Sequence, residues 1–294
     1  MPPSHFFCGA LKQQGAAACG VLPFSALTPY MSGRARERAL SLCPGARSVL
    51  AADFPYFAGE TKGNLSVYAR GTDYHIAVAA RLQRACDLFR TAFPDCCFVP
   101  GVDNSPLPEK TAARLSGIGM LGQNTLILCP PYGSYIFLGT ILTDLLLDPE
   151  RRRESPPCPG CGRCVSACPT GALSRMEGRT VLNQNLCVSR LTQKKGQLTP
   201  EEEQILARHP YLWGCDLCQT VCPLNQNAKP SPLPELAGKD DAAPYLASLT
   251  PQLILPLGQA EFQNRFGSRA FAWRGVAVLK RNIVLHKKAS RFPY

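Results

Sequence analysis

Along the first 150 residues of the 294-residue chain, short apolar runs alternate with stretches of helical periodicity. The apolar runs, bounded by turn-forming residues, are typical of buried strands. The expected strands span 48–54, 96–102, 125–129 and 135–142. The expected helices span 76–93 and 109–116, where apolar residues recur at helical spacing. This alternation predicts an α/β domain.

The composition changes sharply at "RRRESPPCPG", which we interpret as a domain boundary. A cysteine-rich module follows, and a Pro-rich stretch, "NAKPSPLPELAGKDDAAP", separates it from a tail with helical character. The expected domains span 1–150, 151–230 and 231–294.

The bulk composition is that of a globular protein, with 45% hydrophobic and 18% charged residues. The apolar stretch 135–147 is interrupted by Gly139, Thr140, Thr143 and Asp144, so it does not predict a membrane span. The first residues lack a charged segment followed by a long apolar core, so we expect a cytoplasmic protein.

The net charge of +11 gives a basic surface, which attracts polyanions such as nucleic acids. The densest basic positions are Arg151–Arg153, Lys194–Lys195, Lys280–Arg281 and Lys287–Lys288. Charge alone leaves open a basic protein with no nucleic-acid partner.

Fifteen cysteines in a long chain without an export signal argue against a secreted disulfide framework. Four of them, followed by Pro169, match the bacterial ferredoxin pattern C-x2-C-x2-C-x3-C-P: Cys158, Cys161, Cys164 and Cys168. A four-cysteine zinc site would instead use two pairs separated by a longer loop. In the ferredoxin pattern the fourth cysteine binds another cluster, so the run predicts a second one.

A second run, Cys215, Cys218 and Cys222 followed by Pro223, repeats the spacing but lacks one ligand, and Cys187 is the candidate for it. Two [4Fe–4S] clusters are therefore expected, with the last cysteine of each run exchanged. The predicted sets are Cys158, Cys161, Cys164 and Cys222, and Cys168, Cys187, Cys215 and Cys218. The other seven cysteines have no ligand spacing, and most are expected to be free thiols in the core: Cys8, Cys19, Cys43, Cys86, Cys96, Cys97 and Cys129.

Gly117, Gly119 and Gly122 have the spacing of a dinucleotide-binding loop. The order of elements is reversed, because a helical stretch precedes the glycines and a strand follows, so NAD binding is not expected. Close approach of a large ligand and a tight loop without a ligand both remain open.

Several stretches together resemble the epoxyqueuosine reductase family. They are "YARGTDYH" (68–75), "VDNSPLPEK" (102–110), "GIGMLGQNTLIL" (117–128), "GSYIFLGTILTDLLL" (133–147), "CGRCVSACPTGAL", "LCVSRLT", "WGCDLCQTVCPLN" and "LKRN". The resemblance implies an α/β cobalamin-binding domain like that of reductive dehalogenases, then a two-cluster bacterial ferredoxin-like module and a short helical tail. The family's enzymes remove the epoxide oxygen of a modified base at the tRNA wobble position.

The resemblance also implies cofactors and roles. Cobalamin would be held without a histidine ligand from the protein. An external donor such as a flavodoxin or ferredoxin would supply electrons to cobalamin through the clusters. The enzyme would be a monomer. Asp103 would be the proton donor to the opened epoxide, with a raised pKa; a turn or helix cap is the alternative reading of this residue. Asp144 is the weaker candidate acid. The residues implied at cobalamin or substrate are Arg70, Tyr74, His75, Gly117, Gly119, Gly122, Asn124 and Ser134.

The chain departs from the family's usual pattern at Met120 and Gln123, where an aromatic residue and a lysine are common, and the family's helical-repeat extension is not expected. Two alternatives are kept. A reductase with the same cofactors could act on a small molecule, or a two-cluster protein could only transfer electrons.

Overall fold

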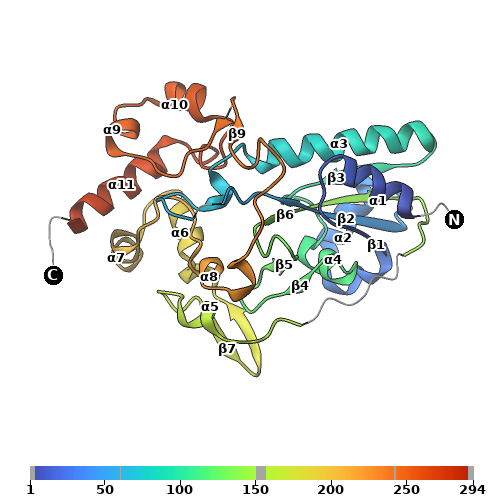
Figure 1. The fold of residues 1–294 in the computed structure, drawn as a ribbon, viewed down its shortest axis with the longest axis horizontal. Coiled ribbons are helices and arrows are strands. Elements are labelled where there is room, and N and C mark those ends of the chain that lie inside the picture. Colours follow the sequence, from blue (N-terminus) through green and yellow to red (C-terminus); the bar gives the residue numbers. More distant parts are fainter. Residues whose placement is uncertain (1–3, 60, 150–156, 242, 291–294) are drawn as a thin grey trace.

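The computed structural model describes residues 4–59, 61–149, 157–241 and 243–290. A sheet covered by helices occupies the half of the molecule nearer the N-terminus, and the cluster module with the last helices occupies the other half (Figure 1). Residues 150–156, which include Arg151–Arg153, lie outside the described residues.

The first half is organised around a four-stranded sheet of order β1-β2-β6-β3. The strands are β1 (Cys19–Pro23), β2 (Ser48–Pro55), β6 (Ile136–Thr143) and β3 (Phe98–Gly101). Each neighbouring pair is antiparallel, so β2 and β3 run in the same direction on either side of β6. All residues of β2 are buried, because helices cover both faces of the sheet.

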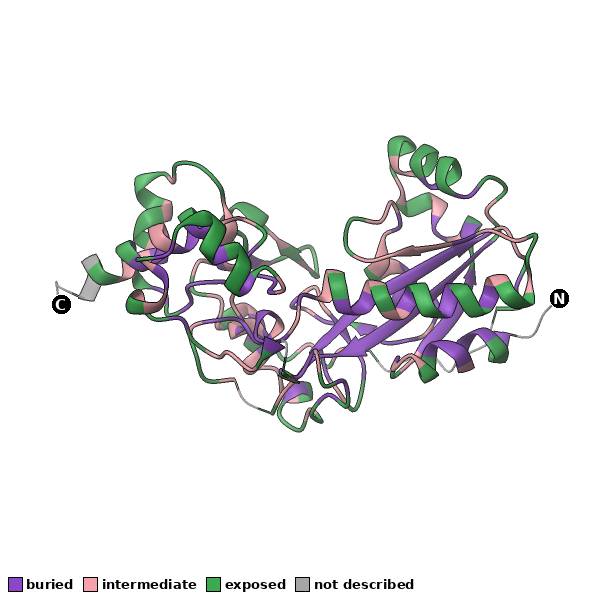
Figure 2. Cartoon of the chain, turned by 90° about the horizontal axis from the view of Figure 1, so that it is seen from above, coloured by how far each residue is buried: buried purple, intermediate pink, exposed green. Residues whose placement is uncertain are grey.

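Four helices cover this sheet: α1 (Ser4–Gln13), α2 (Gly33–Leu42), α3 (Tyr74–Ala92) and α4 (Glu109–Leu115). On one face α1 and α3 share a core with Leu50, Phe54 and Ile141. On the other face α2 and α4 share a core with Val49 and Leu142. The strands are buried while the covering helices keep exposed outer faces (Figure 2). The helices and strands predicted around 48–54, 76–93, 96–102, 109–116 and 135–142 are therefore present, whereas α1, β1 and α2 were not predicted.

The glycine-rich segment forms a small hairpin of β4 (Met120–Leu121) and β5 (Ile127–Leu128). Gly117 follows the end of α4 with a φ of +75°, a left-handed conformation that favours glycine. A Cβ on Gly119 would lie 2.5 Å from the carbonyl oxygen of Leu128, so only glycine lets the two strands approach. The strand predicted over 125–129 is shorter because Thr125 has a φ of +62° within the turn.

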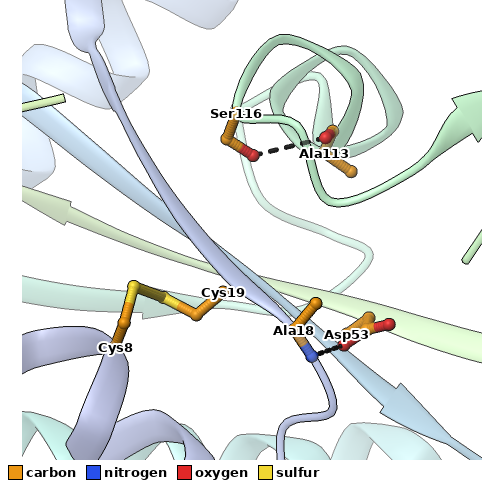
Figure 3. The surroundings of a disulfide bond; sticks show 6 residues. All are labelled: Cys8, Ala18, Cys19, Asp53, Ala113 and Ser116. Atoms are coloured by element: carbon orange, nitrogen blue, oxygen red, sulfur yellow. Dashed lines mark hydrogen bonds between the residues drawn. A yellow bond between two sulfur atoms is a disulfide. The ribbon is translucent and has the colours of Figure 1, made fainter. Parts of the chain in front are cut away.

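Cys8 and Cys19 form a disulfide that joins α1 to β1 (Figure 3). The expectation that core cysteines are free thiols is therefore wrong for this pair, although both residues are buried. Of the remaining five cysteines without ligand spacing, Cys43, Cys86 and Cys129 are buried free thiols, as expected. Beside the disulfide, the backbone N–H of Ala18 donates a hydrogen bond to the carboxylate of Asp53 (Figure 3).

The second half contains short elements. In the cluster module they are α5 (Arg163–Ser166), β7 (Leu173–Met176), β8 (Arg179–Leu182), α6 (Val188–Gln193), α7 (Pro200–Arg208) and α8 (Leu217–Thr220). After them come β9 (Lys239–Asp240), β10 (Ala243–Pro244), α9 (Pro251–Ile254), α10 (Gln259–Phe266) and α11 (Val276–Ser290). Among the described residues, 3-10 turns also lie in the first half, at Phe24–Ala26, Thr28–Tyr30 and Val67–Ala69, and in the cluster module, at Gln184–Leu186 and Pro223–Asn225.

The two halves interlock through their cores. Leu233 and Leu236, from the segment after the cluster module, pack in the core with α1 and α3. Leu65 and Ala69, from the first half, pack with α10 and α11. Because each half contributes side chains to the core of the other, the sheet and the cluster module are held in place relative to each other. The candidate site lies between the sheet and the cluster module. Among the described residues, none of the helices is both long and apolar enough to span a membrane.

Candidate active site

A cavity of about 800 Å³ lies between the sheet and the cluster module. On the sheet side its wall is formed by the start of α3, the loop after β3, the start of α4, the β4–β5 turn and the start of β6. On the other side the wall contains cysteines of the cluster module and Trp273, which precedes α11. A cavity of this size is in the range of cofactor and ligand sites.

Three side chains form a hydrogen-bonded chain on the sheet-side wall. His75 lies in the first turn of α3, and its Nδ1 is 2.8 Å from Oδ1 of Asp73, the residue that caps this helix. Nε2 of His75 is 3.2 Å from Oδ2 of Asp103, in the loop after β3. Asp103 has a φ of +57°, and its side chain is 56% exposed toward the cavity and solvent. Both ring nitrogens of His75 are thus engaged by carboxylates.

The electrostatics of this chain differ from the sequence-based expectation. Hydrogen bonds to Asp103 and Asp73 raise the pKa of His75 to about 9, so the ring is protonated at neutral pH. The hydrogen bond from His75 lowers the pKa of Asp103 below its usual value. The predicted raised pKa of Asp103 is therefore wrong for this structure, because a cation lies beside the carboxylate. The transferable proton of the pair is on His75.

Glu109 and Lys110, at the start of α4, also line the cavity and were not singled out from the sequence. Burial raises the pKa of Glu109 to about 8. Its Oε1 is shielded from solvent and has no hydrogen-bond partner. Burial lowers the pKa of Lys110, and the nearby thiols Cys218 and Cys187 oppose this shift. Glu109 is half-buried and Lys110 is exposed. Both residues belong to the "PLPEK" stretch, but spacing alone did not indicate that they line a cavity.

The predicted cluster cysteines gather in two groups. Cys168, Cys187, Cys215 and Cys218 all line the large cavity. Cys158, Cys161, Cys164 and Cys222 line a small recess next to Gly122 and Asn124. The electrostatic contacts between thiols lie mostly within these groups: Cys158 and Cys161 raise the pKa of Cys222, and Cys187 and Cys168 raise that of Cys215. One contact joins the two groups, because Cys164 raises the pKa of Cys218.

No group of three or more His, Cys, Asp or Glu side chains among the described residues is arranged around a single metal ion.

Two predicted cofactor contacts, Ser134 and Asn124, line the cavity but have structural partners in the cluster module. The Ser134 hydroxyl donates to Oε1 of Gln219 at 2.9 Å and accepts from Nδ2 of Asn225 at 2.8 Å. Nδ2 of Asn124 donates to the carbonyl oxygen of Cys218 at 3.5 Å. Both residues thus connect the sheet-side wall to the module that carries the cysteines.

Arg70 and the loop glycines lie elsewhere. The Arg70 side chain is fully buried, and it donates to the carbonyl oxygens of Leu65 and Thr61 and to the hydroxyl of Tyr245. A guanidinium needs such partners when it is removed from water. Arg70 is not among the residues that line the cavity, so its predicted contact with cofactor or substrate is not present in this structure. Gly117, Gly119 and Gly122 are not among the cavity-lining residues. The left-handed φ after α4 accounts for Gly117, and the close approach of Leu128 across the hairpin accounts for Gly119.

Another predicted residue, Tyr74, does line the cavity and stacks on Phe137 with ring centroids 4.4 Å apart. Trp273, which the sequence did not single out, contributes a side chain that is 55% exposed although it lines the same cavity. The guanidinium of Arg274 lies 3.5 Å from the centroid of the Trp273 ring.

Asp144, the weaker candidate acid, lies at the other end of the sheet, where it accepts a hydrogen bond from the backbone of Cys97.

Comparisons with known proteins agree with this architecture. Residues 157–225 match the family profile of a 4Fe–4S double cluster binding domain. Residues 36–103 match that of epoxyqueuosine reductase QueG, DUF1730. The epoxyqueuosine reductase of Bacillus cereus is 33% identical over 266 residues, which cover 86% of this chain and 67% of that protein. The one from Synechocystis is 32% identical over 273 residues, which cover 89% of this chain and 90% of that protein.

A solved structure of epoxyqueuosine reductase with an epoxyqueuosine-modified tRNA-Tyr stem loop matches with a TM-score of 0.78 and 27% identity, covering 96% of this chain and 80% of that chain.

The fold and the paired cysteine groups define an oxidoreductase with two iron–sulfur clusters. The sequence and structural matches then place the chain in the epoxyqueuosine reductase family. The predicted order of an α/β domain followed by a two-cluster ferredoxin-like module is confirmed, and the two predicted [4Fe–4S] clusters agree with the matched double cluster domain.

Proposed function

We propose that this chain reduces epoxyqueuosine to queuosine at the wobble position of tRNA, using cobalamin and two [4Fe–4S] clusters. The observation that carries the proposal is that the His75–Asp103 pair and four cluster cysteines line one cavity. This supports the proposal, because removal of an epoxide oxygen as water needs a proton donor and an electron donor at the same cavity.

The residues of the cavity fit cobalamin bound without a protein histidine. His75 is the histidine among the lining residues, and its two nitrogens are engaged by Asp73 and Asp103, so it is not available to a metal. Apolar and aromatic side chains such as Tyr74 and Phe137 supply surface for a large ring. When bound, cobalamin supplies the low-potential chemistry that opens an epoxide carbon–oxygen bond.

The two cysteine sets are proposed to have different roles. The set of Cys168, Cys187, Cys215 and Cys218 lines the cavity and is proposed to hold the cluster next to cobalamin. The set of Cys158, Cys161, Cys164 and Cys222 is proposed to hold the cluster that accepts electrons from a flavodoxin or ferredoxin. The exposure of Cys161 supports this assignment, because an external donor needs surface access.

Asp103 and His75 are proposed to act as one proton-transfer unit. At neutral pH the proton is on Nε2 of His75, 3.2 Å from the Asp103 carboxylate. The half-exposed position of Asp103 lets its carboxyl group reach a substrate in the cavity and pass this proton to the departing oxygen.

Several features support tRNA as the substrate. The chain has a net charge of +11, and Lys110 adds a basic side chain to the cavity wall. The exposed face of Trp273 offers a stacking surface for an unpaired base of the anticodon loop. Because tRNA is the proposed substrate, the proposed location is the cytoplasm.

We also propose that the chain is a monomer and that it is divided into three domains, which span 1–150, 151–230 and 231–294.

The test is an anaerobic preparation with reconstituted clusters and added cobalamin. About eight irons and one corrinoid per chain are expected. A stem loop carrying epoxyqueuosine is then followed by mass spectrometry for the loss of one oxygen. Asp103→Asn should abolish turnover, while Asp95→Asn, an exposed carboxylate in the loop before β3, should not. Full cluster and corrinoid loading with no oxygen loss from the stem loop would refute the proposed substrate.

A further inference from the structure

The proton requirement of the proposed reaction exceeds what the His75–Asp103 pair holds. Converting an epoxide to an alkene breaks both carbon–oxygen bonds and releases the oxygen as water. This consumes two electrons, which the external donor supplies, and two protons. At neutral pH, Asp103 is ionised and His75 is protonated, so the pair contributes one proton. A second proton must therefore reach the cavity in each turnover.

The carboxyl group of Glu109 is placed to carry that second proton. Glu109 lines the same cavity, and its carboxylate accepts a hydrogen bond from the backbone of Asp103. Its Oε1 is shielded from solvent and has no hydrogen-bond partner. A buried carboxylate oxygen without a donor is costly, whereas the neutral acid needs fewer partners. The geometry therefore favours the protonated form.

We propose that Glu109 is a proton-reserve residue that reprotonates the Asp103–His75 pair after that pair has given its proton to the departing oxygen. This inference rests on the proposed function. Glu109 acts through the pair, so its role is one of proton supply rather than direct attack on the substrate.

The charged surroundings of Glu109 agree with this role. Its pKa is raised to about 8, mainly by burial. The backbone hydrogen bond from Asp103 and the His75 cation oppose this shift, while the Asp103 carboxylate adds to it. Tyr74 faces the same group from the start of α3, and Lys110 follows it on α4. A pKa near 8 keeps Glu109 protonated at neutral pH yet able to release the proton to a neighbour.

The first experiment needs no turnover. Infrared difference spectra between the wild-type holoenzyme and Glu109→Gln isolate the carbonyl band of a protonated Glu109, which is titrated from pH 6 to pH 10. We expect a band at neutral pH that disappears with a midpoint near pH 8. Glu261→Gln, which removes an exposed acidic residue from the first turn of α10, is the matched control and should leave the band unchanged. An absent band at pH 6 would show an ionised Glu109 and overturn the inference.

The second experiment measures single-turnover reduction of the modified stem loop across the same pH range. Glu109→Gln should slow it by about 10²-fold and remove the decline near pH 8, with iron and corrinoid contents unchanged. Glu109→Asp keeps a carboxyl group and should recover part of the rate, which also covers a Gln variant that folds poorly. A Gln variant with the wild-type rate and pH profile would overturn the inference. If the wild type itself fails to reduce the stem loop, the proposed function fails and so does the relay, whatever the infrared titration shows.

Discussion

Replacing Asp103 by Asn should make His75 easier to deprotonate, and the size of the change can be worked from the structure. The carboxylates of Asp103 and Asp73 raise the pKa of His75 from 6.5 to about 9. Without screening, this difference corresponds to about 3 kcal/mol. The side chain of His75 is 36% exposed and that of Asp103 56%, so water screens the pair. We therefore assign about 1 kcal/mol to the Asp103 contact.

The expected result is a His75 titration midpoint that falls by roughly one pH unit in Asp103→Asn. The substitution suits the site because Asn tolerates the positive φ of residue 103. Asp73→Asn should also lower the midpoint while keeping the cap on α3. The assay is NMR of labelled histidine, in which the chain offers only four ring signals. Asp95→Asn is the control and should leave the His75 signal in place.

The same interaction predicts how stability depends on pH. Because the folded-state pKa of His75 is raised, its stabilising contribution is fully present below pH 6.5 and is lost as the pH rises through about 9. Asp103→Asn should therefore lower the free energy of unfolding by about 1 kcal/mol at pH 6 and by little at pH 10. A wild-type His75 that titrates near 6.5, or a midpoint that Asp103→Asn does not move, would refute the reasoning.

Three further predictions concern the clusters, the substrate and the core. Cys161→Ser and Cys222→Ser should disturb the same one of two reduced-cluster signals in electron paramagnetic resonance, because both line one recess; effects on different signals would contradict the exchanged ligand sets. Trp273→Ala should weaken stem-loop binding by about 1–3 kcal/mol with unchanged iron content, and unchanged affinity in a titration would exclude base stacking. Cys8→Ser should lower the free energy of unfolding by about 2–3 kcal/mol in denaturant titrations under non-reducing conditions, since it opens a bridge that spans a sequence separation of 11; an unchanged midpoint would show that the disulfide does not form.

Features with a local origin were predictable from the sequence. Cluster ligands within each run are a few residues apart, so the spacing of Cys158, Cys161 and Cys164 already indicates the kind of site. The strand at 48–54 and the helix at 76–93 follow from apolar runs and periodicity, and the structure has β2 and α3 at these places. The family resemblance added the order of the modules and the candidate residues around the cavity.

Features that depend on distant neighbours were not predictable in the same way. The three loop glycines suggested a ligand, but at Gly119 the close approach of Leu128 across the hairpin accounts for the residue. Arg70 belongs to a matching stretch, yet its guanidinium is enclosed by Thr61, Leu65 and Tyr245. Trp273 came from a tail described only as helical, and the folding of that tail brings it to the cavity.

The chemistry of the site depends most on tertiary structure. Asp103 was expected to hold a proton, but folding places it 3.2 Å from a histidine 28 residues away, and this cation keeps the carboxylate ionised. Glu109 was read only as part of a helix, whereas burial in the assembled cavity raises its pKa to about 8. The sequence by itself therefore determined which ligands and acids the chain carries. Only the tertiary structure decided where the protons reside, because a pKa depends on burial and on charges that the fold brings together.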